Sequence, residues 1–448
     1  MHQILTPNTD VVRTVSSDLA CEVEDYLGGG GQGEVYKAKL IGGTLSKQGN
    51  ESVALKWYFP HYQSQDERLR ERLELAINNG APTDRFLWPL DLVTSPDIPV
   101  FGYIMRLREP RFKGIVDLMK RRVEPTFRAL ATAGFELAHN YFQLHSRGMC
   151  YRDIAFGNVF FDPKTGEVRI CDNDNVDVNG RKGPIGGTPR FMAPELVRGD
   201  AAPSTDTDLF SLSVLLFYMF VIHHPLEGAN ELKIHSFDLH AMRKLYGTDP
   251  LFIFDPDNDT NRPVEGFHDN AIQFWPIYPE FFKRFFIKSF TDGVRDAANG
   301  RVRETEWRLA MIKLRDSILY CANCSAENFY DVEALKASGG KPSVCWQCRR
   351  EVRLPFRIRI GKNVIMLNND TELFAHHLEE KAWEFSRALA KVSPHPKNPG
   401  IWGLKNISDG KWVANADGST QDVLPGQSVK LVKGTKIHFG RADGEIRY

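Results

Sequence analysis

Four of the seven cysteines lie in two close pairs in the last third of the chain. Cys321 and Cys324 are separated by two residues, as are Cys345 and Cys348, and about twenty residues lie between the pairs. Each pair can form a tight knuckle, and two knuckles can close a tetrahedral shell of four thiolates around Zn²⁺. Because sulfur fills all four positions, we expect a structural zinc site with no open position for water. Two redox-active C-x-x-C pairs are the alternative, but neither lies in a thioredoxin-like βαβ pattern.

A glycine run occupies most of residues 28–33. Gly28, Gly30 and Gly33 fit the spacing G-x-G-x-x-G, and Val35 follows two residues later. One reading is a linker. The other is a hairpin whose backbone N–H groups approach phosphate oxygens, since glycine has no Cβ in the way. Strand-like sequence lies directly on both sides of the run, which favours the hairpin.

Lys56 ends an apolar strand-like run, VALK, and a buried lysine is costly unless it is paired. Residues 64–67, Ser-Gln-Asp-Glu, form a capping box that predicts a helix beginning near residue 65. Glu74 lies beside the apolar stripe of this helix and is therefore a candidate partner for Lys56. The alternative is a surface carboxylate on a charged helix.

Polar residues with a regular spacing follow in CYRDIAFGNVFFDPKTGEVRICDND, residues 150–174. Arg152-Asp153 precedes Asn158 by the spacing R-D-x-x-x-x-N. A strand-like hairpin then leads to Asp172.

The glycine run, VALK, R-D-x-x-x-x-N, Asp172 and MAPE at residues 192–195 occur in the same order as in eukaryotic-type protein kinase domains, and the chain resembles that family. A later apolar stretch with Asp208 resembles the helix whose aspartate braces the catalytic loop. The resemblance covers roughly residues 22–318. It implies a two-lobed α+β fold, which strand-like runs followed by helical runs also favour.

The resemblance implies a serine/threonine protein kinase that uses ATP and Mg²⁺ (or Mn²⁺) on protein substrates. Lys56 is expected to hold the α- and β-phosphates, with Glu74 orienting it. Asn158 and Asp172 are expected to bind the metal, which prefers hard oxygen ligands. Asp153 is expected to align the acceptor hydroxyl and take its proton. The residues that the resemblance places around the nucleotide are Leu27, Gly28, Gly30, Gly33, Val35, Ala54, Lys56, Met105, Asn158 and Asp172.

Three departures from the kinase pattern bear on this expectation. Tyr151 replaces the usual histidine before Arg-Asp, at a largely structural position. Ala155 replaces the usual lysine, which removes a positive charge near the transferred phosphate. Asp-Asn-Asp at residues 172–174 replaces Asp-Phe-Gly but keeps the metal ligand. An active kinase therefore has two rivals: a pseudokinase scaffold, and an adaptor whose functional half is residues 319–448.

The segment between Asp172 and Glu195 carries one hydroxyl side chain, that of Thr188. By resemblance this threonine is structural and lies near Asp153, and Arg301 pairs with Glu195. We therefore expect that activity is not switched on by phosphorylation of this segment and that control comes from elsewhere.

Four regions separate along the chain. Residues 1–20 are polar and are expected to form a tail or one edge strand. Residues 21–318 are the expected kinase domain, and residues 319–354 the zinc ribbon. Residues 355–448 alternate short apolar and polar runs with turn signals, which predicts a small all-β module.

The predicted all-β module has features of a forkhead-associated sandwich. Gly361-Lys362 stands where that family has Gly-Arg. His377 remains from its S-R-x-H stretch, but Phe374 and Ala375 replace the serine and the arginine. A plain β-sandwich without phosphopeptide binding is the alternative reading.

A kinase domain, a Cys₄ ribbon and a β module in one chain resemble the bacterial stress-response kinases of tellurite-resistance-associated phosphorylation systems. This resemblance implies a role in stress signalling. It also implies two partners, a von Willebrand A-type protein and a metal-dependent protein phosphatase.

Charge and hydropathy exclude other classes of function. Lysine plus arginine and aspartate plus glutamate are balanced at 57 each, which gives no electrostatic case for binding nucleic acid or an anionic membrane. The most apolar stretch, residues 209–222, is shorter than the roughly 20 residues that span a bilayer and better suits a buried core helix. The sequence carries no secretory signal pattern, and the other three cysteines are scattered, so we expect a cytoplasmic protein.

Overall fold

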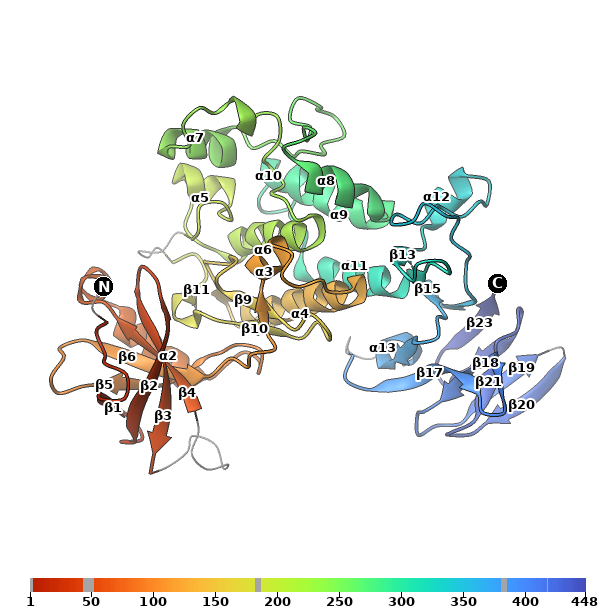
Figure 1. Cartoon of the computed structure of the whole chain (residues 1–448), viewed down its shortest axis with the longest axis horizontal. Helices are drawn as coiled ribbons and strands as arrows, with labels where there is room; N and C mark the ends of the chain where they lie inside the picture. Colours follow the sequence, from red (N-terminus) through yellow and green to blue (C-terminus); the bar gives the residue numbers. More distant parts are fainter. Residues whose placement is uncertain (1–2, 43–51, 182–186, 380–384, 417) are drawn as a thin grey trace. The chain divides into compact units, whose positions relative to one another are not determined.

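The computed structural model describes residues 3–42, 52–181, 187–379, 385–416 and 418–448 (Figure 1). These residues form two compact units. The first comprises Met1–Trp275 and Arg284–Leu309, and the second comprises Pro276–Lys283 and Ala310–Tyr448. The second unit resumes at Ala310, whereas the sequence placed the end of the kinase domain at residue 318.

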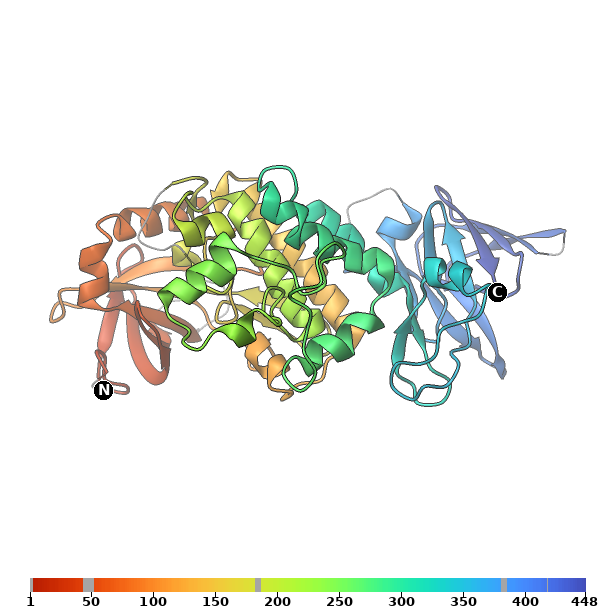
Figure 2. The ribbon, with the colours of Figure 1, turned by 90° about the horizontal axis from the view of Figure 1, so that it is seen from above.

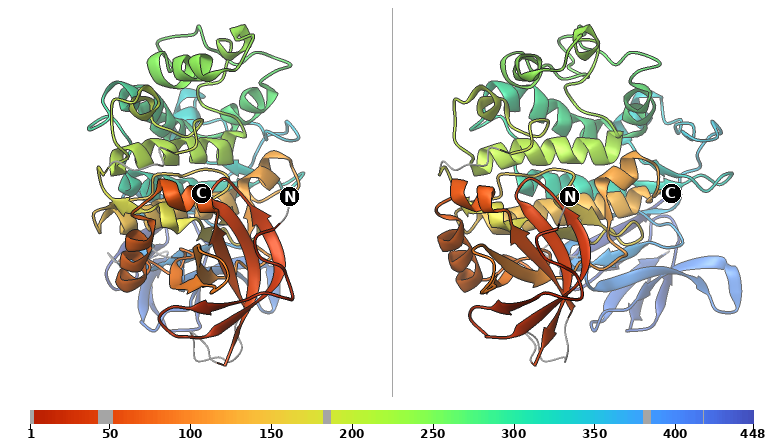
Figure 3. Two further views of the ribbon diagram at one scale, coloured as in Figure 1. Left: turned by 90° about the vertical axis from the view of Figure 1, so that its left-hand side faces the viewer. Right: turned by 60° about the vertical axis from the view of Figure 1, so that its left-hand side comes forward.

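The first lobe of the first unit is a closed barrel of antiparallel strands in the order β1-β2-β3-β4-β6-β5. Side chains alternate between core and surface along β3, where Tyr36, Ala38 and Leu40 are fully buried. Figure 3 shows the strands curving around one another. The strands are β1 Val11–Thr14, β2 Ala20–Gly29, β3 Gly33–Ile41, β4 Ser52–Tyr58, β5 Pro89–Thr94 and β6 Phe101–Arg106.

Part of the expected N-terminal tail belongs to this barrel. β1 pairs with both β2 and β5. Leu5 and Val12 are buried in the barrel core, and burial of these apolar side chains favours an ordered segment over a tail. Asp91 adds hydrogen bonds by accepting the backbone N–H groups of Ser16 and Ser17 at 3.0 and 3.1 Å.

Two helices follow β4 in place of the one that the capping box predicted. α1 spans Pro60–Gln65 and begins with proline, which suits the first helical position because the N–H group it lacks would have no partner there. α2 spans Leu69–Asn79 and so begins later than predicted. The Ser64 hydroxyl donates to the carbonyl of His61 and does not cap α2.

The second lobe is mainly helical, and Figure 2 shows its yellow to green helices apart from the red strands of the barrel. Its central helix is α6, Thr205–Val221, in which every residue from 207 onward is buried. A helix that is apolar on all sides belongs in a core, as predicted for residues 209–222. The other helices are α3 Ile115–Met119, α4 Phe127–His145, α5 Pro194–Arg198, α7 Leu239–Arg243, α8 Asp269–Phe274, α9 Glu280–Phe290, α10 Asp292–Arg295 and α11 Glu304–Asp316.

Within the described ranges, no helix is both long and apolar enough to cross a bilayer. The short helical turns in this part of the chain are η1 Asn173–Asn175, η2 Glu231–Lys233, η3 Lys244–Thr248 and η4 Trp275–Ile277.

Short strands position the polar motifs of the second lobe. One small sheet has the order β10-β9-β7, and a second pairs β11 with β8. Asp153 and Asn158 lie in the loop between β8 and β9, and Asp172 lies two residues after β10. These strands are β7 Lys113–Gly114, β8 Met149–Cys150, β9 Val159–Phe161, β10 Val168–Ile170 and β11 Asp177–Val178.

After α11, the second unit contains a cysteine-bearing segment and then two sheets. β12 Ile318–Tyr320 pairs with β13 Glu327–Phe329, and α12 Val332–Ala337 follows. One sheet has the order β15-β14-β23-β22-β19-β20, and the other β16-β17-β18-β21. Their side chains share one apolar core, which the buried Trp412 helps to fill.

The elements of the two sheets account for most of residues 355–448. They are β14 Arg357–Ile360, β15 Asn363–Met366, β16 Glu372–Phe374, α13 Ala375–Leu378, β17 Ala388–His395, β18 Asn398–Asn406, β19 Trp412–Ala416, β20 Ser419–Val423, β21 Ser428–Lys430, β22 Lys436–His438 and β23 Asp443–Arg447. The region is therefore almost entirely β, with one short helix among its described elements.

Candidate active site and metal centre

A cavity of about 620 Å³ lies between the β2–β3 hairpin and the β8–β9 loop. All ten residues that the sequence placed around a nucleotide line it, from Leu27 before the hairpin turn to Asp172 after β10. Leu87, Leu107 and Phe160 add apolar walls that the motif spacing did not reveal. Apolar walls with a few convergent polar groups are typical of small-molecule sites.

The glycine run forms the turn of the hairpin over this cavity. β2 ends at Gly29 and β3 begins at Gly33, and the Gly30 N–H donates to the Gly33 carbonyl at 2.9 Å. Gly33 must lack a side chain, because a Cβ there would lie 2.1 Å from the carbonyl oxygen of Trp57 on β4. Gly31 has open space at the same place. The run is therefore a hairpin and not a linker.

Lys56 on β4 is buried at the back of the cavity among three oxygen-bearing side chains. Its Nζ donates to Asp174 at 2.9 and 3.2 Å and to Asp172 at 3.4 Å. It also donates to Gln32 of the hairpin turn at 2.5 Å. Burial alone would lower the pKa of Lys56, but the charges of Asp174 and Asp172 raise it above its usual range, so the ammonium group stays charged.

Glu74 does not meet Lys56, which corrects the expectation from the sequence. Its carboxylate is half exposed and accepts from Arg70, one turn earlier on α2, at 3.0 Å. α2 turns Arg72 and Leu73 inward. Each residue of an α-helix is rotated by about 100° from the one before, so Glu74, which follows the buried Leu73, faces the solvent.

The carboxylate of Asp153 is held between two partners. The Asn158 side chain donates to this carboxylate at 3.1 Å and to the Asp153 carbonyl at 2.8 Å. Thr188 donates its backbone N–H and its hydroxyl to the other carboxylate oxygen at 2.8 and 2.7 Å. The sequence had placed Thr188 near Asp153, and the structure brings them into contact at the cavity.

Asp208 on α6 braces the β8–β9 loop, as the resemblance implied. It accepts the backbone N–H groups of Tyr151 and Arg152 at 2.5 and 2.9 Å. The Tyr151 hydroxyl donates to the carbonyl of Cys171, so it ties this loop to the segment that carries Asp172. Arg152 and Asp172 both have left-handed backbones, with φ of 76° and 50°. Such strain in residues other than glycine clusters at functional sites.

His145 at the end of α4 lies between two carboxylates. Its Nε2 is 3.1 Å from Asp208 of α6, and its Nδ1 contacts Glu304 of α11. Burial would lower the pKa of His145, but hydrogen bonds to Asp208 and Glu304 raise it to about 9. The imidazole is therefore charged near neutral pH and joins three helices of the second lobe.

Ion pairs anchor the segment between Asp172 and Glu195. Arg152, which follows Tyr151 in the catalytic loop, donates to Asp177 at 3.0 Å, and both side chains are buried. Arg181 donates to the same carboxylate at 3.3 Å. At the far end, Arg301 donates to Glu195 at 2.8 Å, the pairing expected from the resemblance.

The two aspartates beside Lys56 have different surroundings. Burial would raise the pKa of Asp174, but the charge of Lys56 and the hydrogen bond from Tyr58 lower it. Burial and the nearby charge of Asp174 raise the pKa of Asp172 although Lys56 opposes this. Asp172 lines the cavity with Asn158. It is therefore Asp172 that is placed to meet a cation there.

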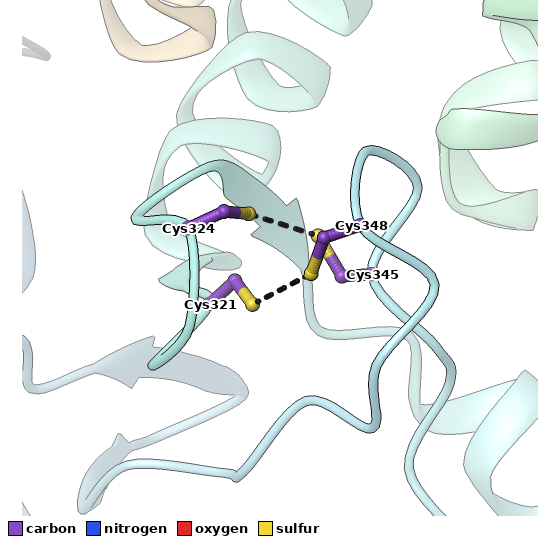
Figure 4. A group of neighbouring side chains, drawn as sticks. All are labelled: Cys321, Cys324, Cys345 and Cys348. Carbon is purple, nitrogen blue, oxygen red and sulfur yellow. Dashed lines mark hydrogen bonds between the residues drawn. The ribbon is translucent and has the colours of Figure 1, made fainter.

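The four paired cysteines converge from two loops of the second unit, and their side chains point toward one another (Figure 4). The sulfurs of Cys321 and Cys348 are 3.6 Å apart, and those of Cys324 and Cys345 are 3.7 Å apart. A tetrahedral site with Zn–S bonds of about 2.3 Å has sulfur–sulfur edges of about 3.8 Å. A disulfide needs about 2.05 Å. The residues present therefore fit a zinc ion.

Both cysteine pairs sit on the same kind of backbone turn. The N–H of Ser325 donates to the carbonyl of Cys321, and the N–H of Arg349 to that of Cys345, each at 2.9 Å. Ser325 and Arg349 both have φ of 60°. The Asn328 side chain donates to the sulfur of Cys345 at 3.5 Å, the kind of contact that orients a metal ligand.

His377, the remaining residue of the forkhead-associated pattern, is buried and engaged. Its Nδ1 accepts the N–H of Phe374 at 2.9 Å, and its Nε2 lies 3.2 Å from Asp316. Gly361 and Lys362 form the turn between β14 and β15. The histidine is therefore turned inward, away from any ligand at the surface.

Comparisons with known proteins agree on one family. Residues 104–276 match the model of the protein kinase domain. Protein kinase MCK1 of Saccharomyces cerevisiae is 26% identical over 266 residues, which cover 58% of this chain and 60% of that protein. Probable serine/threonine-protein kinase CCRP1 of Zea mays is 32% identical over 118 residues, covering 25% of this chain and 19% of the relative. Protein kinase C delta type of Mus musculus is 36% identical over 92 residues, covering 20% and 13%.

The matches leave parts of this chain and of its relatives unmatched. The chain spans less than two thirds of the length of each of these three relatives. The family match contains Asp153, Asn158 and Asp172 but begins after the glycine hairpin and Lys56. The structure brings those two features to the same cavity. The matched region and the geometry of the cavity together support a protein kinase domain in this chain.

Proposed function

We propose that this chain is a protein kinase that transfers the γ-phosphate of ATP to serine or threonine hydroxyls of protein substrates. One observation carries the proposal: Lys56, Asp153, Asn158 and Asp172 come from distant parts of the sequence and line one cavity. The similarity to the probable serine/threonine-protein kinase of Zea mays favours that class of acceptor.

Each of these side chains has a role in phosphoryl transfer. Lys56 presents a fixed positive charge to the α- and β-phosphates beneath the hairpin. Asn158 and Asp172 would hold Mg²⁺ or Mn²⁺ through their side-chain oxygens, and the bound metal would neutralise phosphate charge. Asp153 accepts the proton of the substrate hydroxyl, and Thr188 and Asn158 hold its carboxylate in place.

Labelled ATP tests this proposal and its acceptor class together. The full-length chain with Mg²⁺ and a mixed protein acceptor should incorporate label, and hydrolysis of the product should yield phosphoserine and phosphothreonine. Asp153→Asn should incorporate about 100-fold less, in the range lost with a general base. Label found only in phosphotyrosine, or no label with the wild-type chain, contradicts the proposal.

A pseudokinase scaffold is the second candidate. Ala155 in place of the usual lysine favours it, since this position lies two residues after Asp153 and supplies no charge to the transferred phosphate. A scaffold would bind nucleotide without turning it over. Saturable binding of ATP with no transfer to any acceptor would select this candidate.

We propose a structural zinc ion at Cys321, Cys324, Cys345 and Cys348. The sulfur–sulfur separations of 3.6 and 3.7 Å support it, as do the matching turns that carry the two pairs. Native mass spectrometry should find one zinc ion per chain, and Cys345→Ser should lose it. A folded chain without bound metal contradicts the site.

We further propose that the module at residues 355–448 is a forkhead-associated-like β-sandwich without phosphopeptide binding. Two sheets around one core support the sandwich, and the buried His377 supports the loss of binding. A phosphothreonine peptide library should show no enrichment on the full chain over its dephosphorylated copy. Selective capture of phosphopeptides contradicts the proposal.

The most specific proposal concerns the role of this protein in the cell. The combination of kinase domain, Cys₄ segment and β module supports a bacterial, cytoplasmic stress-response kinase of the tellurite-resistance-associated type. Its partners would be a von Willebrand A-type protein and a metal-dependent protein phosphatase. Deletion of the gene should sensitise the source cell to tellurite, and complementation with Asp153→Asn should not restore growth. Unchanged tellurite tolerance contradicts this assignment.

A further inference from the structure

The buried side of Lys56 faces an aspartate that the sequence motifs assign to no function. Both oxygens of Asp174 accept from Lys56 Nζ, at 2.9 and 3.2 Å. The Lys56 side chain is 4% exposed and that of Asp174 is 1% exposed. Asp172 lies further from Nζ, at 3.4 Å, and lines the cavity, which Asp174 does not. The lysine is therefore flanked by one carboxylate on the cavity side and one behind it.

Asp174 is itself held in a fixed position. The hydroxyls of Tyr58 and Tyr103 donate to its two carboxylate oxygens at 2.5 and 3.4 Å. Arg72 of α2 donates to its backbone carbonyl at 3.0 Å and pairs with the buried Asp66 at 2.7 Å. These contacts come from β4, β6 and α2. A carboxylate restrained from three elements can fix the position of the cation that it binds.

The acidic residue on α2 that was expected to orient Lys56 cannot do so in this arrangement. Glu74 is half exposed and pairs with Arg70. α2 instead reaches the lysine indirectly, through Arg72 and the backbone of Asp174.

We propose that Asp174 is the positioning residue for Lys56, holding its ammonium group where it meets the phosphates of the nucleotide. This inference rests on the proposed kinase function and deepens it. Asp172 and Asp174 then divide two tasks: Asp172 faces the cavity and its metal, and Asp174 orients the lysine. The Asp-Asn-Asp triplet combines both tasks at the start of η1, where Asp172 is the N-cap and Asp174 lies in the turn.

Kinetics of isosteric variants of the full-length chain test this role. Asp174→Asn keeps the shape but removes the charge, and we expect kcat to fall about 100-fold, as misplacement of a reacting group by about 1 Å produces. Asp174→Glu, which restores the charge, should recover part of that loss. Glu71→Gln, on the exposed face of α2, is the matched control and should stay within about twofold. Glu74→Gln should behave like this control, and a loss as large as that of Asp174→Asn would overturn the proposal.

A double-mutant cycle on nucleotide affinity separates positioning from general destabilisation. With Mg²⁺ and a fluorescent ATP analogue, Asp174→Asn should weaken binding about tenfold, roughly the worth of one charge-assisted hydrogen bond. In a Lys56→Met background it should weaken binding no further. Equal losses in both backgrounds, or no loss in either, would overturn the proposal. Coupling in affinity from a chain that transfers no phosphate would uphold the positioning role and overturn the kinase function.

Discussion

Surroundings, more than residue type, distinguish the titratable groups of this site. Asp172 and Asp174 are two residues apart and both contact Lys56, yet their pKa values shift in opposite directions. Asp172 lines the cavity and can therefore bind a ligand that exchanges with solvent. Asp174 is buried and can therefore keep one partner, Lys56, at all times. This division allows a buried lysine to stay charged while one carboxylate remains available in the cavity.

At Gly33 we predict that alanine destabilises the barrel, whereas alanine at Gly30 does not. The new Cβ at Gly33 would meet the backbone oxygen of Trp57 at 2.1 Å, and at Gly30 it would meet open space. Since the clash is with backbone, strands β3 and β4 must shift, at a cost of about 1–3 kcal/mol. Thermal unfolding of the two variants by calorimetry measures this difference. Equal midpoints for the two would contradict the close approach.

Motif spacing predicted the residues that face the cavity but not their buried supports. Lys56, Asp153, Asn158 and Asp172 were found because each belongs to a pattern of types and spacing. In the sequence, Asp174 was noted only because it replaces the glycine of Asp-Phe-Gly. Nothing in the sequence indicates which carboxylate contacts the buried side of Lys56. Glu74 was wrongly predicted to face Lys56. Which face of α2 points inward depends on how Arg72 packs, and a local sequence pattern does not contain this information.

Helices meet at charged junctions in the second lobe. His145 joins α4 to α6 and α11 through Asp208 and Glu304, and the same Asp208 holds the catalytic loop. The junction and the loop that carries Asp153 therefore share one buried carboxylate, that of Asp208.

Stability should depend on pH through His145. Its folded pKa of about 9 lies above the ordinary value of 6.5. The stabilisation is therefore complete below pH 6.5, amounts to about 3 kcal/mol, and is lost as the pH rises from 6.5 to 9. The thermal midpoint of wild type should exceed that of His145→Gln most at pH 6 and approach it at pH 9.5. A gap that stays constant over this range would show that the imidazole is neutral in the folded chain.

We predict that activity needs no phosphate on the segment after Asp172. Arg152 already has a buried carboxylate partner in Asp177, and Thr188 is engaged with Asp153. Phosphatase-treated protein should transfer phosphate at the same rate as untreated protein. Asp177→Asn should lose activity, because it leaves the buried charge of Arg152 without an ion-pair partner, at a cost of about 3–5 kcal/mol. An enzyme that becomes active only when Thr188 is phosphorylated would contradict this reading.

Element prediction succeeded where the pattern was long and failed where it was short. α6 was recognised because residues 209–222 are apolar on every side, which only a core helix satisfies. The capping box at residues 64–67 was wrong because Pro60 starts a separate helix before it. For residues 1–20 the sequence left a tail and one edge strand open; β1 is a strand there, but it pairs on both sides, with β2 and β5, so it is not an edge.

Across the whole chain, the cysteine segment is stabilised differently from the rest, because the two sheets of the second unit share a large apolar core of their own. The first unit has extensive apolar cores in the barrel and around α6. The cysteine segment of the second has a small cluster to which Cys321 and Cys345 themselves belong, together with Leu319 and Val352. A cluster of this size contributes little burial, so metal should supply much of the local stability.

Removal of zinc should therefore act locally. A strong chelator, or Cys345→Ser, should raise hydrogen exchange over residues 318–352 and leave exchange around α6 unchanged. The two knuckles lose the bond that closes them, whereas the core of the first unit contains none of these cysteines. Hydrogen exchange with mass spectrometry measures both regions in one experiment. Unchanged exchange over residues 318–352 would show that the segment folds without metal.

The role of Asp153 can be measured by the single-turnover rate of γ-phosphate transfer in wild type and in Asp153→Asn, with ATP affinity determined in parallel. Asp153 is proposed to act on the acceptor hydroxyl and not on the nucleotide. We therefore expect a rate about 100-fold lower in the variant, with ATP affinity unchanged within about threefold. Equal rates of transfer in the two proteins would contradict this role.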